Sequence, residues 1–85
     1  MIALTQPASA LLALVAQNPE VSQPIIDRLL REIDAELEPI VRRAVQVIQE
    51  QAHKPEIEII PTDPAEAIAK SYLVWSRQNA AVAAR

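Results

Sequence analysis

The chain contains no glycine, and this absence excludes several kinds of binding site before any other feature is considered. The phosphate-binding loops of nucleoside triphosphatases, dinucleotide-binding loops and EF-hand calcium loops all need glycine at fixed positions. Tight Asn-Gly and Asp-Gly hairpin turns are excluded for the same reason. Turns in this chain must therefore be made by proline and by helix-capping side chains. Seven prolines, at positions 7, 19, 24, 39, 55, 61 and 64, divide it into segments.

Composition narrows the class of protein further. The 85 residues, 1–85, suffice for one small helical domain with a limited core. Cysteine is absent, which excludes disulfides and thiolate metal sites, and the net charge of −3 argues against a nucleic-acid partner. Hydrophobic residues make up 51% of the chain, which is a large supply for this length. We therefore expect either a very well-formed core or apolar surface that another chain covers.

A first, short helix is predicted over about 7–17. Pro7 suits the first position of a helix, Leu11, Leu12 and Val15 follow at helical spacing, and Pro19 stops the pattern. The apolar run 8–16 is too short to span a bilayer. No basic residue precedes position 28, so the run also lacks the charged start of a signal peptide. We expect a cytoplasmic or virion protein that is not secreted by a signal peptide and has no membrane partner.

The strongest periodic pattern lies within 23–52. Its apolar residues form a heptad seam with no change of phase, made by Ile26, Leu30, Ile33, Leu37, Ile40, Ala44 and Val47. Pro39 lies inside this seam, where it either breaks the chain into two helices near Glu38 or kinks one continuous helix. The unchanged phase favours one kinked helix of about 30 residues, or roughly 45 Å. Since a compact chain of this size is only about 30 Å across, the helix would overhang its own domain and meet a partner chain.

Residues 55–61 alternate polar and apolar side chains between two prolines, a pattern typical of extended chain. No second strand pattern occurs in the sequence, so a β-strand here would need a partner strand from another molecule. The favoured alternative is an extended connector that lays Ile57 and Ile59 on the helices.

The last helix is predicted over about 64–83. Asp63 can cap its start, Pro64 suits the first helical position, and Glu66 lies where a capping box has its acid. Tyr72 and Trp75 are three residues apart and share one face of this helix. They are predicted to anchor the core or, as the sharper alternative, to form an interface hot spot. The predicted fold class is therefore all-α.

The residue types needed for catalysis are scarce. His53 is the single histidine, and a metal site needs several convergent ligands, so we expect it only to lie at a helix end. The four acids Glu32, Asp34, Glu36 and Glu38 are predicted to form a solvated face. With one histidine and no glycine-flanked serine, serine catalysis is not expected. The sequence thus predicts no catalytic, cofactor or metal site and no small-molecule substrate.

These expectations favour a non-enzymatic assembly protein that buries helical seams against copies of itself or a larger partner. A small accessory subunit of a large particle, such as a phage virion, would fit. The alternative is a small regulatory adaptor that binds a protein through the acidic face. The predicted protein-interface residues are Ile26, Leu30, Ile33, Leu37, Ile40, Val47, Ile57, Ile59, Tyr72 and Trp75.

Overall fold

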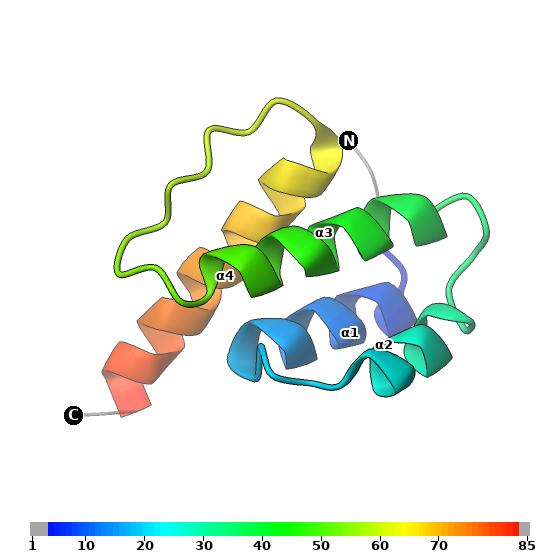
Figure 1. Ribbon diagram of the computed structural model, residues 1–85, viewed down its shortest axis with the longest axis horizontal. Helices are drawn as coiled ribbons and strands as arrows, with labels where there is room; N and C mark the ends of the chain where they lie inside the picture. The colour runs from blue at the N-terminus through cyan, green and yellow to red at the C-terminus, as the bar shows by residue number, and fades with distance from the viewer. Residues whose placement is uncertain (1–3, 84–85) are drawn as a thin grey trace.

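The computed structural model describes residues 4–83, with side chains described for 4–80, and it confirms the all-α prediction. The described part of the chain forms α1 (Gln6–Gln17), α2 (Gln23–Leu30), α3 (Glu38–Gln51) and α4 (Pro64–Ala83). In Figure 1, α1 and α2 lie below α3, and α4 runs obliquely behind it. The radius of gyration is 12.4 Å, which agrees with the roughly 12 Å expected of a compact chain of this length.

Prolines begin the helices of this chain. α1, α2 and α3 each have proline at their first or second position, and α4 starts at Pro64 itself. The first four backbone N–H groups of a helix have no hydrogen-bond partner within the helix. A proline there, which has no N–H, therefore costs no helical hydrogen bond. At α4 the predicted cap is also present, because Asp63 Oδ1 accepts a 2.9 Å hydrogen bond from the backbone N–H of Glu66. The Glu66 carboxylate instead accepts a hydrogen bond from the Thr62 hydroxyl.

The prediction of one kinked helix over 23–52 is wrong. α2 ends at Leu30, and residues 31–37 form turns before α3 begins at Glu38. The backbone N–H groups of Glu32 and Ile33 bond to carbonyls three residues back, which tightens the chain and ends α2. Pro39 lies at the start of α3 rather than inside a helix, so it costs no helical hydrogen bond.

The heptad phase survives this break because of the length of the turn segment. Residues 31–37 are seven residues, the length of one heptad, so α2 and α3 keep the same sequence register without being one helix. The folded-back arrangement lets Ile26 and Leu30 pack against the same core as Val41 and Val45. The overhang expected of a 45 Å helix therefore does not occur, and the molecule measures 38 × 27 × 20 Å.

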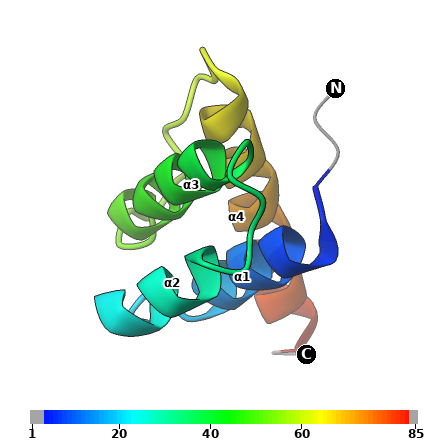
Figure 2. The same ribbon diagram turned by 90° about the vertical axis from the view of Figure 1, so that its right-hand side faces the viewer.

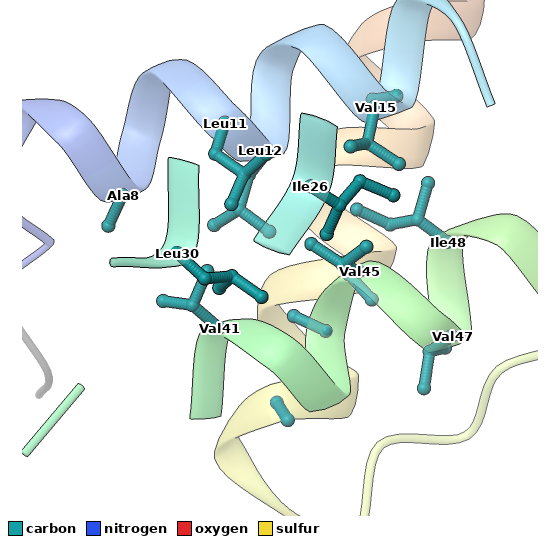
Figure 3. Packing of buried hydrophobic residues seen from close by; sticks show 14 of the residues in the cluster. Ala8, Leu11, Leu12, Val15, Ile26, Leu30, Val41, Val45, Val47 and Ile48 are labelled. Carbon is teal, nitrogen blue, oxygen red and sulfur yellow. The ribbon is translucent and has the colours of Figure 1, made fainter. Parts of the chain in front are cut away.

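The helices enclose one cluster of buried apolar side chains. α4 packs most extensively on α3, and α1 lies against α2, α3 and α4 (Figure 2). In Figure 3, side chains from α1, α2 and α3 point toward one another in this cluster. The largest fully buried members are Leu11, Leu12, Val15, Ile26, Leu30, Val41 and Ile48. No charged or polar residue among those described is buried, so the core is held by apolar packing alone.

The chain between α3 and α4 is a connector tied down at its start and along its length. Arg77 of α4 donates hydrogen bonds to the carbonyl oxygens of Lys54 (2.7 Å) and Pro55 (2.9 Å). Burial then alternates: Ile59 is 6% exposed, whereas its neighbour Ile60 is 83% exposed. This period of two is that of extended chain, and it carries Ile57 and Ile59 toward the helices. No strand pairing occurs within residues 4–83, and pairing with another molecule stays a prediction.

Candidate functional site

The side chains that could act in catalysis or bind a metal lie apart from one another or make structural hydrogen bonds. Within the described residues no three His, Cys, Asp or Glu side chains converge as metal ligands would. His53 is exposed in the turn that follows α3, near the helix end where it was expected. The hydroxyls of Ser9 and Tyr72 bond to each other at 2.7 Å, and the Ser76 hydroxyl donates to the carbonyl of Ala16 at 2.9 Å. Both serines therefore join α1 to α4 rather than facing a catalytic base.

The acidic run does not lie around a helix as predicted. Glu32, Asp34 and Glu36 are exposed in the turn segment between α2 and α3, and Glu38 begins α3. Glu38 accepts a 2.7 Å hydrogen bond from Nε of Arg42, whose Nη1 also lies 3.4 Å from Asp27 of α2. The hydrogen bond to Glu38, followed by the charges of Glu38 and Asp27, raises the pKa of Arg42 above its ordinary value. Glu38 is thus paired with Arg42 within α3, Arg42 connects α3 to α2 through Asp27, and the other three acids of the run face solvent.

Most of the predicted interface residues lie in the chain's own core. The buried ones are Ile26, Leu30, Ile33, Val47 and Ile59. Four more are partly buried against the same cluster, namely Leu37, Ile40, Ile57 and Tyr72. Trp75 differs from the rest because 38% of its surface is exposed. In this fold Trp75 is therefore the member of the predicted set that is most open to a partner.

Trp75 lies between two hollows on the surface of α4. The first, of about 400 Å³, is lined by Ser9 and Ala13 of α1 and by Ser71, Tyr72 and Trp75 of α4. The second, of about 520 Å³, is lined by Pro61 of the connector and by Ala67, Lys70, Ser71, Val74, Trp75 and Gln78 of α4. The Trp75 and Tyr72 rings meet edge to face, with centroids 6.2 Å apart and planes at 80°. This contact fixes the position of the Trp75 ring between the hollows.

The surface around Trp75 carries little charge, because Lys70 is the single charged residue among those that line the two hollows. α1 has no charged residue in its sequence. The charged residues of α4 are Glu66, Lys70 and Arg77, whose spacing of four and seven places them on one stripe of the helix. None of the three is fully exposed, and Arg77 is held by the connector. We use the name α1–α4 face for the surface formed by eight exposed or half-exposed uncharged residues of these two helices, namely Ala10, Ala13, Leu14, Ala67, Ser71, Val74, Trp75 and Gln78.

Trp75 was predicted from the sequence, but the other residues of this face were not. Ala13, Ser71, Val74 and Gln78 carry no distinctive chemistry, so no motif marks them. A signal was nevertheless present: α1 lacks charge, and all three charges of α4 share one stripe. On a small globular domain a helix surface is ordinarily charged, so two adjacent helices with uncharged outer sides indicate a candidate interface.

Comparison with known protein families, characterised proteins and solved structures finds no match to this chain. The search for membrane spans, limited to the described residues, finds no helix with the length and apolar character needed to cross a bilayer. The α1–α4 face is therefore the feature from which function can be inferred.

Proposed function

We propose that the chain is a non-enzymatic assembly protein that docks through the α1–α4 face onto a protein partner, either another copy of itself or a larger particle. One observation carries this proposal: an exposed tryptophan stands between two hollows whose lining includes a single charged side chain, that of Lys70. The heptad seam, which suggested assembly from the sequence, is occupied by the core. The proposal therefore moves the interface from the seam to the outer sides of α1 and α4.

The energetics of docking favour such a surface. Tryptophan and tyrosine are enriched among the residues that dominate binding energy, especially where they fill pockets in the centre of an interface. Trp75 and Tyr72 are adjacent and already ordered by their edge-to-face contact, so little side-chain freedom is lost when a partner covers them. Because Lys70 is the single charged residue that lines the two hollows, docking strips little charge of its water. An accessory subunit of a large particle, such as a virion, is one assembly that this surface would suit.

The adaptor alternative depends on the exposed acids Glu32, Asp34 and Glu36. They stand on a turn segment that also contributes to an open hollow, whose charged lining residues are Asp27, Arg31, Glu38 and Arg42. Acids and bases are mixed there, and the Arg42 guanidinium is already paired with Glu38 and Asp27. A basic partner would have to compete with these arginines, so we favour the α1–α4 face.

Site-directed photo-crosslinking tests the proposed face and can capture a partner of any identity. A photoreactive amino acid is placed at Ser71 or at Gln78, and the protein is produced in the cells from which it comes. The matched control position is Gln46, which is exposed on α3. We expect discrete crosslinked products from positions 71 and 78 and none from position 46. Equal products from all three positions, or none from 71 and 78, would contradict the proposal.

A further inference from the structure

We propose that residues 31–37 are a hinge through which the α1–α2 half of one chain exchanges with that of a second copy. In the closed chain, α1 packs on α3 and α4 of the same molecule, and α2 packs on α3. In the exchanged dimer the hinge straightens, and each α1–α2 half packs on the α3–α4 half of the other copy. The exchange uses the chain's own core as its interface and does not depend on a partner for the α1–α4 face.

The core itself selects the partner. Side chains of the α1–α2 half, such as Leu12 and Ile26, are buried in one cluster with Val45 and Ile48 of α3 (Figure 3). When the two halves separate, each one exposes the apolar surface that the other covered. A second open chain supplies the same missing half, so exchange regenerates the contacts of the closed core between two copies.

The composition of the hinge favours a straight helix over a turn. Five of the residues 31–37 are arginine, glutamate, alanine or leucine, and the segment contains neither glycine nor proline. Those four residue types are strong helix formers, whereas turns ordinarily use glycine, proline, asparagine, aspartate or serine. Asp34 is the one turn-favouring residue of the segment. The turn therefore depends on the packing of the closed molecule more than on its local sequence.

The backbone at both ends of the hinge is already helical. Arg31, which follows α2, and Leu37, which precedes α3, both have φ and ψ angles of the right-handed helical region. No residue of the segment has a positive φ. Within the described chain, the N–H groups of Asp34, Ala35 and Glu36 have no backbone hydrogen-bond partner. Straightening the hinge would thus supply partners for these groups and would change the chain over only a few residues.

The register of the apolar side chains suits one continuous helix. Because the hinge is as long as one heptad, the apolar seam passes through it from α2 to α3 without a change of phase. Ile33 and Leu37 are the members of the seam within the hinge, and both pack on the core in the closed chain. A straightened hinge would therefore keep the whole seam on one side of the helix.

Pro39 is the main obstacle to exchange. In the closed chain it lies in the first turn of α3, where it costs no helical hydrogen bond. In the straightened helix it would lie in the interior, remove one helical hydrogen bond and clash with the carbonyl of Ala35. An exchanged dimer contains two such sites, one in each hinge. Pro39 thus holds the chain in its closed form.

Two opposite substitutions test the hinge. Pro39→Ala removes the obstacle, whereas Ala35→Pro adds one at an exposed position whose N–H makes no backbone hydrogen bond in the closed chain. Pro24→Ala, at the start of α2, is the matched control. Each full chain is unfolded in urea, refolded at concentrations from about 1 µM to about 1 mM, and examined by sedimentation equilibrium.

We expect Pro39→Ala to lower the dissociation constant of the dimer at least about a hundredfold relative to the wild type, since a proline inside each helix is removed. Pro24→Ala should leave that constant unchanged, and Ala35→Pro should be monomeric at every concentration. Circular dichroism at about 1 µM, compared with the wild type, establishes that each variant is folded.

A distance within one chain distinguishes exchange from any other dimer. The chain has no cysteine, so spin labels attach only where Asp27→Cys and Arg42→Cys are introduced into Pro39→Ala. The two native side chains lie 3.4 Å apart in the closed chain, and losing this exposed ion pair costs little stability. A continuous helix would separate the two positions by 15 residues, or about 22 Å. Labelled chain is mixed with an excess of unlabelled chain before refolding, so that only distances within one chain are measured.

We expect the short distance in the monomer and about 22 Å in the dimer. A dimer that keeps the short distance within each chain would overturn the exchange. A Pro39→Ala chain that stays monomeric, or an Ala35→Pro chain that dimerises as readily as Pro39→Ala, would also overturn it. None of these results bears on crosslinking from position 71, so the hinge and the α1–α4 face are tested separately.

Discussion

Replacing Ile59 by alanine should destabilise the protein far more than the same change at Ile60. The two residues are chemically identical neighbours, but Ile59 is 6% exposed and Ile60 is 83% exposed. Comparing the two variants therefore isolates the contribution of burial to stability, because the residue type is the same and the position on the connector differs by one residue.

The expected magnitude follows from the carbon atoms removed. Isoleucine to alanine deletes three carbons, and each buried methylene contributes about 0.8 kcal/mol, so a fully buried site loses about 2.4 kcal/mol before any cavity term. Scaled by burial, Ile59→Ala should cost about 2–3 kcal/mol of unfolding free energy, whereas Ile60→Ala should cost about 0.4 kcal/mol. The loss expected for Ile59→Ala is a large part of the total unfolding free energy of a small domain.

Urea unfolding followed by far-ultraviolet circular dichroism measures both variants, because the helices unfold with the core. A difference of about 2 kcal/mol corresponds to a shift of roughly 8–16 °C in the melting temperature of a domain of this size. Equal costs for the two variants would refute the inward packing of the connector. A larger cost at Ile60 would indicate that the connector presents its other side to a second chain.

Two further predictions test the helix boundaries. Pro39→Ala should change the unfolding free energy, measured by urea unfolding, by less than about 1 kcal/mol, because Pro39 stands in the first turn of α3. A stabilisation of about 3 kcal/mol would instead indicate a proline inside a continuous helix. Asp63→Ala should lower the unfolding free energy by about 1 kcal/mol, because it removes the acceptor for the Glu66 N–H, whereas Asp63→Asn should keep most of the stability that the cap provides. Equal losses for the two variants in the same assay would show that the cap does not stabilise α4.

The helices themselves were largely predictable because proline and capping residues have local effects. Pro7 and the pair Asp63-Pro64 marked the starts of α1 and α4 to within one residue. The start of α3 at Glu38 matches the alternative that was not favoured, in which Pro39 breaks the chain into two helices. The unchanged heptad phase favoured one continuous helix over a break at Pro39. The phase is unchanged because the turn segment 31–37 is as long as one heptad.

The candidate site was less predictable, since periodicity shows which residues avoid water but not what covers them. Ile26, Leu30 and Val47 were predicted to meet a partner chain, yet α2 and α3 fold back and bury them within the chain. Whether a seam is internal depends on tertiary contacts that local patterns do not encode. Trp75 was identified by residue type alone, and the hollows beside it exist only once α1 is packed against α4.

Fluorescence of Trp75 tests the central claim most directly, because it is the only tryptophan in the chain and stands in the middle of the α1–α4 face. Quenching by acrylamide, a neutral quencher, is measured on the free chain and on its complex with the protein that position 71 captures, after the signal of that protein alone is subtracted. We expect quenching to fall and the emission to shift to the blue as the partner covers the exposed part of the ring. Quenching and emission that are the same in both samples would contradict docking through this face.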